Sequence, residues 1–152
     1  MPSPHWARVA VILVGIEAAE CAIATPWQLS FFNVLAAGHG DRIVNDSNVD
    51  WGQGLIALRR EMKSRGIEQV QLAYHGSLDP AEYGISYRPY LGGRPDTSRG
   101  WLAVSSYYYV GLPQRMVTSG GETPFQALDV GPLRSLAPVA RPARCMYLFR
   151  LR

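Results

Sequence analysis

The densest group of polar side chains in this sequence lies between residues 45 and 53. The segment reads NDSNVDWGQ, and its candidate ligand-binding residues are Asp46, Asn48, Asp50, Trp51 and Gln53. Carboxylate and amide groups can hydrogen-bond sugar hydroxyls, and an indole ring offers a face for stacking. The pattern indicates a sugar or phosphate site, and it is equally consistent with a turn and helix cap made from the same residue types.

Two further polar positions are expected to join this group. His75 follows the predicted strand 69–74, and Ser105 follows the predicted strand 101–104. Open α/β sheets bind their ligands at the carboxyl ends of the strands. We therefore add His75 and Ser105 to the candidate ligand-binding residues.

The same residues could instead form the active site of a hydrolase or a metal site. His75 near Asp46 or Asp50 would supply the acid and base of a small hydrolase, which is the alternative function. The order D-x-N-x-D from Asp46 is similar to the start of a calcium loop. However, Trp51 stands where that loop needs glycine, and Ala57 stands where it needs glutamate. We expect neither a metal nor a cofactor, and no catalytic residue is assigned.

The elements that would position these side chains predict a small α/β domain. Residues 53–65 place apolar side chains on one face and basic ones on the other, which predicts a helix capped by Asp50 and ended by Gly66. Strand, helix and strand over 42–74 predict a βαβ unit with parallel strands, in a sheet that is mixed or parallel. The predicted strands comprise residues 42–45, 69–74, 101–104 and 145–151.

The chain of 152 residues is long enough for one globular domain with an appendage. We place an apolar helix at 1–26 and the α/β domain at 27–152, with a proline- and glycine-rich segment at 113–143. The net charge of +3 is spread along the chain, so we expect no nucleic-acid partner. Cys21 and Cys145 do not have the spacing of a zinc site and are predicted to be buried as small apolar side chains, with a disulfide between them as the alternative.

The N-terminal helix is the segment that could contact a membrane. Residues 9–16 form an unbroken apolar run, and we expect the helix over 9–25 to span a membrane. Glu17 and Glu20 interrupt the apolar character. A cleaved signal peptide and a helix of the protein core are therefore the alternatives.

The segment from Asn45 to Leu55, NDSNVDWGQGL, resembles part of the C-terminal region of polytopic membrane glycosyltransferases. These are lipid-carrier-dependent, mannosyltransferase-like proteins of the GT-C type. The later pieces YHG at 74–76, DP at 79–80 and YGI at 83–85 are similar to that region as well. The family's catalytic acidic residues lie in early loops that have no counterpart here.

The resemblance implies an extracytoplasmic accessory domain, detached or truncated from such a transferase and lacking its catalytic centre. The implied partners are a membrane, a glycan or lipid-linked sugar, and a membrane-embedded transferase subunit. The implied location is the membrane, with the globular part extracytoplasmic. A remnant without function is a further alternative. The sequence departs from the family at Gly54, where an acidic residue is usual, and at His75, where phenylalanine is frequent.

Overall fold

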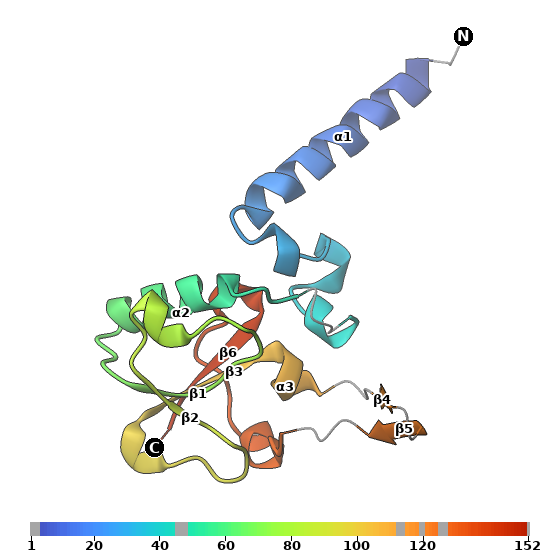
Figure 1. Cartoon of the computed structure of the whole chain (residues 1–152). Helices are drawn as coiled ribbons and strands as arrows, with labels where there is room; N and C mark the ends of the chain where they lie inside the picture. Colours follow the sequence, from blue (N-terminus) through green and yellow to red (C-terminus); the bar gives the residue numbers. More distant parts are fainter. Residues whose placement is uncertain (1–3, 45–48, 112–114, 119–120, 125–127, 152) are drawn as a thin grey trace.

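The computed structural model describes residues 4–44, 49–111, 115–118, 121–124 and 128–151. A long helix, α1 (Pro4–Ala24), leads away from a domain that is built around one sheet (Figure 1). A second helix, α2 (Gln53–Ser64), covers one face of that sheet.

The main sheet has four strands in the order β2-β1-β3-β6. They are β1 (Val70–Ala73), β2 (Tyr87–Pro89), β3 (Trp101–Ser105) and β6 (Met146–Arg150). Strand β1 runs parallel to both β2 and β3, whereas β6 is antiparallel to β3. The register places Leu72 opposite Pro89 on one side and Ala103 on the other. The domain is therefore of the α/β class with a small mixed sheet, as the sequence predicted.

Alternate residues of the strands enter two separate apolar cores, because successive side chains of a strand point to opposite faces. Leu72 and Ala103 pack under α2, and Leu102 and Val104 pack on the other face. The apolar face of α2 contributes Leu55, Ala57, Leu58 and Met62 to the first core. The second core is completed by Tyr109 and Leu133, together with Tyr147 and Phe149 of β6.

Three predicted strands and the predicted helix are confirmed with small shifts of their ends. Helix α2 begins at Gln53 as expected and ends at Ser64, one residue early. Gly66 follows with a φ of 65°, the left-handed conformation that ends a helix most easily at glycine. Strands β1, β3 and β6 lie inside or within one residue of the predicted ranges.

The predicted strand at 42–45 is wrong, and with it the predicted βαβ unit. The described part of this segment is a short 3₁₀ turn, η3 (Gly40–Arg42), followed by Ile43 and Val44, which are 67% and 49% exposed. Both sides of β1 are already occupied, by β2 and by β3, so no edge of β1 is left for another strand. Strand β2 was not predicted, because it has only three residues and ends in proline.

Short turns and one hairpin complete the domain. The segment between α1 and α2 contains η1 (Gln28–Ser30), η2 (Val34–Ala36) and η3. Later turns are η4 (Pro80–Tyr83), η5 (Thr97–Arg99), η6 (Gly131–Ser135) and η7 (Pro142–Arg144), and a short helix α3 (Ser106–Val110) follows β3. Strands β4 (Arg115–Thr118) and β5 (Gly121–Pro124) form an antiparallel hairpin within the proline- and glycine-rich segment.

Helix α1 projects from the domain, and its described side chains from His5 to Ala19 are exposed. Within the described residues, no helix has the combination of length and apolar character that crossing a membrane requires. The prediction of a membrane-spanning segment is therefore wrong. Glu17 and Glu20 give the physical reason, since a carboxylate inside hydrocarbon is costly. Glu20 instead turns back to the domain, where its Oε1 accepts a hydrogen bond from the Val34 amide at 3.3 Å.

Candidate functional site

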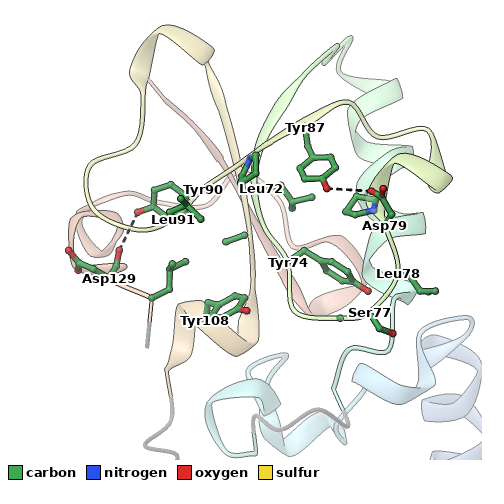
Figure 2. Close-up of a pocket in the computed structure, with 15 residues that line it drawn as sticks. Leu72, Tyr74, Ser77, Leu78, Asp79, Tyr87, Tyr90, Leu91, Tyr108 and Asp129 are labelled. Carbon is green, nitrogen blue, oxygen red and sulfur yellow. Dashed lines mark hydrogen bonds between the residues drawn. The ribbon is translucent and has the colours of Figure 1, made fainter. Parts of the chain in front are cut away.

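An open cavity of about 860 Å³ lies at the carboxyl ends of the parallel strands β1 and β2 (Figure 2). Residues at or just after both strand ends line it, including Ala73 and Tyr74 from β1 and Pro89 and Tyr90 from β2. Parallel strands commonly bind ligands at this edge. We call this cavity the tyrosine pocket, after its polar lining residues Tyr74, Tyr87, Tyr90 and Tyr108, which are joined by Asp79 and Asp129.

The hydroxyls of three of the four tyrosines have different surroundings. Tyr90 is 5% exposed and donates to the carbonyl of Gly93, which holds the loop after β2. The Tyr87 hydroxyl donates to Oδ1 of Asp79 at 3.3 Å. The Tyr74 hydroxyl is buried and has no hydrogen-bond partner within the described residues. These rings therefore present aromatic faces with hydroxyls at different depths.

The two carboxylates of the tyrosine pocket are held in place by their own loops. Oδ1 of Asp79 accepts from the Ala81 amide at 2.9 Å and caps η4. Oδ1 of Asp129 accepts from the Gly131 amide at 3.0 Å. An ionised carboxylate accepts about four hydrogen bonds, so both groups retain capacity toward a ligand. The lining residues of the described chain include no lysine, arginine or histidine, which makes the pocket negatively charged.

The electrostatics of the pocket keep its tyrosines protonated. Burial raises the pKa of Tyr74 to about 12, and the negative charge of Asp50 acts in the same direction. Burial also raises the pKa of Tyr90 and of Tyr108. Each hydroxyl is neutral at physiological pH, and those of Tyr87 and Tyr90, whose protons are already donated within the protein, remain acceptors only.

Asp50 stabilises the turn that leads into α2. Its side chain is buried, and Oδ1 accepts hydrogen bonds from the amides of Gly52 at 3.0 Å and Gly54 at 3.3 Å. Burial raises the pKa of the Asp50 carboxyl, against the lowering effect of these two hydrogen bonds and of the Cys145 thiol. The prediction that Asp50 is the N-cap of α2 is wrong, because Gly52 holds that position, two residues later, and no side chain makes the capping hydrogen bond there.

Gln53 also holds its own loop. Its Oε1 accepts from the Trp51 amide and its Nε2 donates to the Val49 carbonyl, both at 2.8 Å. The Trp51 ring is 66% exposed and is free to stack. A Cβ atom at Gly54 would lie 2.9 Å from both Asp50 Oδ2 and Cys145 Sγ, so any larger residue here would require these side chains to shift. Residues 49–54 thus form a compact turn at the N-terminus of α2.

His75 and Ser105 lie at the predicted edge of the sheet, in different surroundings. The His75 ring stacks on Tyr107 with ring centroids 3.7 Å apart and meets Tyr108 edge-on at 5.9 Å. Ser105 is fully buried, and its hydroxyl has no partner within the described residues. Through Tyr108, His75 borders the tyrosine pocket. Asp46 and Asn48 lie outside the described residues.

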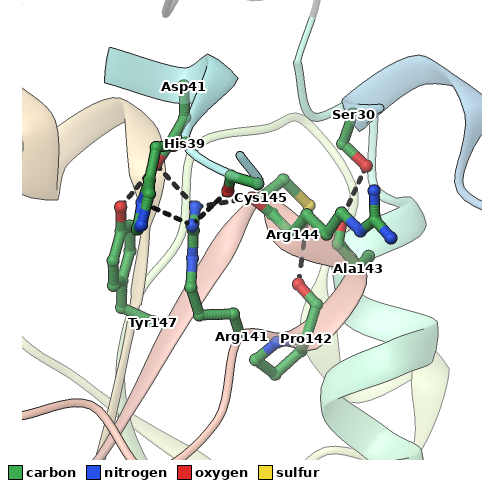
Figure 3. A network of polar contacts seen from close by, with 10 residues as sticks. Ser30, His39, Asp41, Arg141, Pro142, Ala143, Arg144, Cys145 and Tyr147 are labelled. Atoms are coloured by element: carbon green, nitrogen blue, oxygen red, sulfur yellow. Dashed lines mark hydrogen bonds and ion pairs between the residues drawn. The ribbon is translucent and has the colours of Figure 1, made fainter. Parts of the chain in front are cut away.

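A polar network that sequence reasoning missed joins the segment after α1 to β6 (Figure 3). Asp41 is 2% exposed and pairs through Oδ2 with Arg141 Nη2 at 2.8 Å and with the Tyr147 hydroxyl. Arg141 also donates to the carbonyl of Gly38 at 2.6 Å and lies over the Tyr147 ring at 4.5 Å. Burial raises the pKa of Tyr147 to about 12, and the hydrogen bond to Asp41 adds to that effect.

The tyrosine pocket was not predicted from sequence either. Its lining comes from separate loops after β1 and β2, from α3 and from the segment before η6. The one available signal was composition, because residues 76–100 are rich in tyrosine, proline and glycine. No group of three or more metal-binding side chains occurs within the part of the chain that the structure describes.

Comparison with known proteins identifies no relative of this chain. The chain matches no protein-family model, no curated protein and no solved structure.

Proposed function

We propose that this chain is a glycan-binding accessory domain that holds its ligand in the tyrosine pocket and has no catalytic centre of its own. The observation that carries the proposal is the joining of four tyrosines and two carboxylates around one open cavity at the carboxyl edge of the sheet. The resemblance of residues 45–55 to a region of membrane glycosyltransferases supports the same class of ligand.

The chemistry of the pocket suits an uncharged sugar. Aromatic faces pack on the apolar C–H faces of a sugar ring, while Asp79 and Asp129 accept hydrogen bonds from its hydroxyls. A cavity of about 860 Å³ falls within the range of small-molecule sites. The two negative charges disfavour phosphorylated or uronic sugars. We therefore propose a neutral oligosaccharide, or the sugar part of a lipid-linked donor, as the ligand.

The exposed apolar helix α1 supports the second half of the proposal, which is attachment to a partner. Val11, Val14 and Trp6 are 72%, 68% and 69% exposed. Contiguous exposed apolar surface of this kind marks interaction sites. We propose that α1 packs against a membrane-embedded transferase subunit and that the globular part lies on the extracytoplasmic side.

The surroundings of Asp50 do not support the alternative function, a hydrolase. The Asp50 carboxyl is 6% exposed and already accepts two backbone hydrogen bonds, so a substrate in solvent does not reach it. A general acid or base must lie within hydrogen-bond reach of its substrate. An acid–base role would have to fall to Asp46, which lies outside the described residues.

Binding of neutral oligosaccharides, measured by calorimetry over a panel of gluco-, galacto- and mannooligosaccharides, tests the proposed ligand class. The test variant is Tyr108→Leu, which removes a lining ring and keeps apolar volume. The matched control is Tyr107→Leu, because Tyr107 is the neighbouring tyrosine and does not line the pocket. Loss of one stacking ring costs about 1.4 kcal/mol of binding free energy, which raises the Kd about tenfold.

We expect at least one oligosaccharide to bind the wild type, with the loss confined to Tyr108→Leu. Absence of binding across the panel contradicts the proposal. An equal loss in the two variants contradicts it as well, because the loss would then not depend on the ring that lines the pocket. Asp129→Asn is a second variant. It removes the charge and keeps an oxygen that accepts the hydrogen bond from the Gly131 amide. It should weaken oligosaccharide binding without changing the melting temperature.

A further inference from the structure

We propose a second binding site, for an oxyanion of the phosphate class, in the cleft between α2 and η7. A cavity of about 330 Å³ lies there, and its charged lining residues are Arg60, Glu61, Arg141 and Arg144. Trp27, which follows α1, closes one side. This arginine cleft has a charge opposite to that of the tyrosine pocket and shares no lining residue with it.

Two of the three arginines are left without a carboxylate partner. Arg141 is neutralised by Asp41 at 2.8 Å, and Oε2 of Glu61 pairs with Arg65 at 2.8 Å. Arg60 and Arg144 take part in no ion pair within the described residues. The cleft therefore carries two uncompensated positive charges, which an anion with two or more negative charges would balance.

Aromatic rings hold both of these guanidinium groups. Arg60 lies over the Trp27 ring with its Cζ 5.7 Å from the centroid, and Arg144 lies over Phe31 at 4.9 Å. Stacking leaves the N–H groups at the guanidinium edge available as donors. It also restricts the side chains before a ligand binds, so less conformational entropy is lost on binding.

The backbone that carries Arg144 is strained. Ala143 and Arg144 have φ values of 48° and 60°, two consecutive left-handed residues that are not glycine. Such conformations cost about 1 kcal/mol or more each and concentrate at functional sites. Here they are held by hydrogen bonds from the Ser30 hydroxyl to the Ala143 carbonyl and from Arg141 Nη2 to the Arg144 carbonyl at 3.0 Å. The strained turn keeps Arg144 in the cleft that α2 closes with Arg60.

The size and charge of the cleft select a phosphate or diphosphate group. Guanidinium N–H groups pair with phosphate oxygens in a two-point geometry that Arg60 and Arg144 can each offer. The volume of about 330 Å³ has room for one or two phosphates with a small attached group. The phosphate could belong to a small molecule or to a lipid headgroup, which share this chemistry.

Titration of the full chain with inorganic diphosphate at low ionic strength, by calorimetry, tests the site. The test variants are Arg60→Gln and Arg144→Gln, and the matched control is Arg59→Gln. Arg59 precedes Arg60 on α2 and does not line the cleft. We expect each test variant to raise the diphosphate Kd at least tenfold, and the control to change it less than twofold. Added salt should weaken binding in the wild type through screening.

A second arm distinguishes the two sources of phosphate. Vesicles of phosphatidylcholine, with and without phosphatidic acid, are sedimented with the wild type and with Arg60→Gln. Retention that requires both phosphatidic acid and Arg60 assigns the site to a lipid headgroup. Diphosphate binding without such retention assigns it to a small molecule.

The proposal is overturned if neither diphosphate nor phosphatidic acid binds, or if Arg59→Gln weakens binding as much as the test variants do. Melting temperatures of the variants are compared first, because an unfolded variant would lose binding trivially. Arg60 is exposed, so Arg60→Gln keeps the fold even if Arg144→Gln does not. Oligosaccharide binding at the tyrosine pocket should be unaffected by these variants, because the two cavities share no lining residue, and this separates the test from that of the glycan ligand.

Discussion

The Tyr147 hydroxyl donates a hydrogen bond to Asp41 Oδ2, across 106 positions of the sequence. Tyr147 belongs to β6, in the centre of the second core, and Asp41 belongs to the η3 turn. Arg141 pairs with the same carboxylate oxygen at 2.8 Å. These contacts fix the segment after α1 on the sheet, and they are the structural basis of the first two predictions.

Tyr147→Phe is expected to destabilise the protein by about 1 to 3 kcal/mol, the cost of removing one partner from a buried hydrogen bond. The ring and its packing are kept, so the loss is that of the hydroxyl contact alone. Urea unfolding followed by circular dichroism measures the change. Tyr87→Phe is the control, because its hydroxyl bonds to the exposed Asp79, and it should change stability by less than about 0.5 kcal/mol.

The stability of the protein should fall between pH 10 and pH 12. The pKa of Tyr147 is raised from 10.0 to about 12 in the folded state, so the folded state holds this proton more tightly than the unfolded state does. The stabilisation is complete below pH 10 and is lost as the pH rises through about 12. Two pKa units correspond to roughly 2.7 kcal/mol.

Tyr147→Phe should show a shallower loss across this range, while Tyr74, whose pKa is also about 12, still contributes in both proteins. Unfolding free energies measured at half-unit intervals of pH give the two slopes. Identical slopes in the wild type and the variant would contradict the assignment to Tyr147.

Asp50→Asn is expected to be at least as stable as the wild type at pH 7. Burial raises the pKa of the Asp50 carboxyl above 3.8, so its contribution to stability is complete below that pH and is lost as the pH rises through the folded pKa. Burial therefore disfavours the ionised carboxylate, and the amide removes this cost while it keeps an oxygen to accept from Gly52 and Gly54. Asp50→Ala should be about 1 kcal/mol less stable than Asp50→Asn, since the acceptor for the Gly52 and Gly54 amides is lost. Thermal unfolding of the two variants side by side makes the comparison.

Gly54→Ala is expected to destabilise the protein by about 1 to 3 kcal/mol through overpacking. The added Cβ would lie 2.9 Å from Asp50 Oδ2 and Cys145 Sγ, and 3.0 Å from Met146 Cγ. Gly15→Ala is the control, because a Cβ at Gly15 meets nothing within 4 Å and alanine favours a helix. Equal stability of Gly54→Ala and the wild type in urea would show that the neighbouring side chains move apart.

The elements that sequence reasoning predicted correctly are those with a strong periodic signal. Helix α2 has a clear apolar face, and β1, β3 and β6 are apolar runs that become buried. Ile43 and Val44 form an equally apolar run but are exposed, because whether such a run joins a sheet depends on which strand edges are free. Strand β2 was missed since Tyr87–Pro89 is short, contains proline and owes its place to pairing with β1.

In the candidate site, too, contacts between sequence neighbours could be predicted, whereas contacts between residues far apart in the sequence could not. The hydrogen bonds that Asp50 and Gln53 make involve neighbouring residues, so a turn was among the interpretations of that segment. The tyrosine pocket is lined by side chains from four parts of the chain, so no sequence motif or spacing could predict it. The pairing of Asp41 with Arg141 likewise depends on the tertiary fold, because 100 residues separate them.

Strand β2 lies at one edge of the sheet and contains three residues, the last of which is Pro89. A proline lacks the N–H that a neighbouring strand would need, and short edge strands offer few backbone groups to pair with. At the opposite edge, β6 is partly covered by the bridge from Ala140 to Leu148. Both margins of the sheet are thus poor templates for a strand from another molecule, which protects the folded domain from growing into an aggregate by edge-to-edge addition.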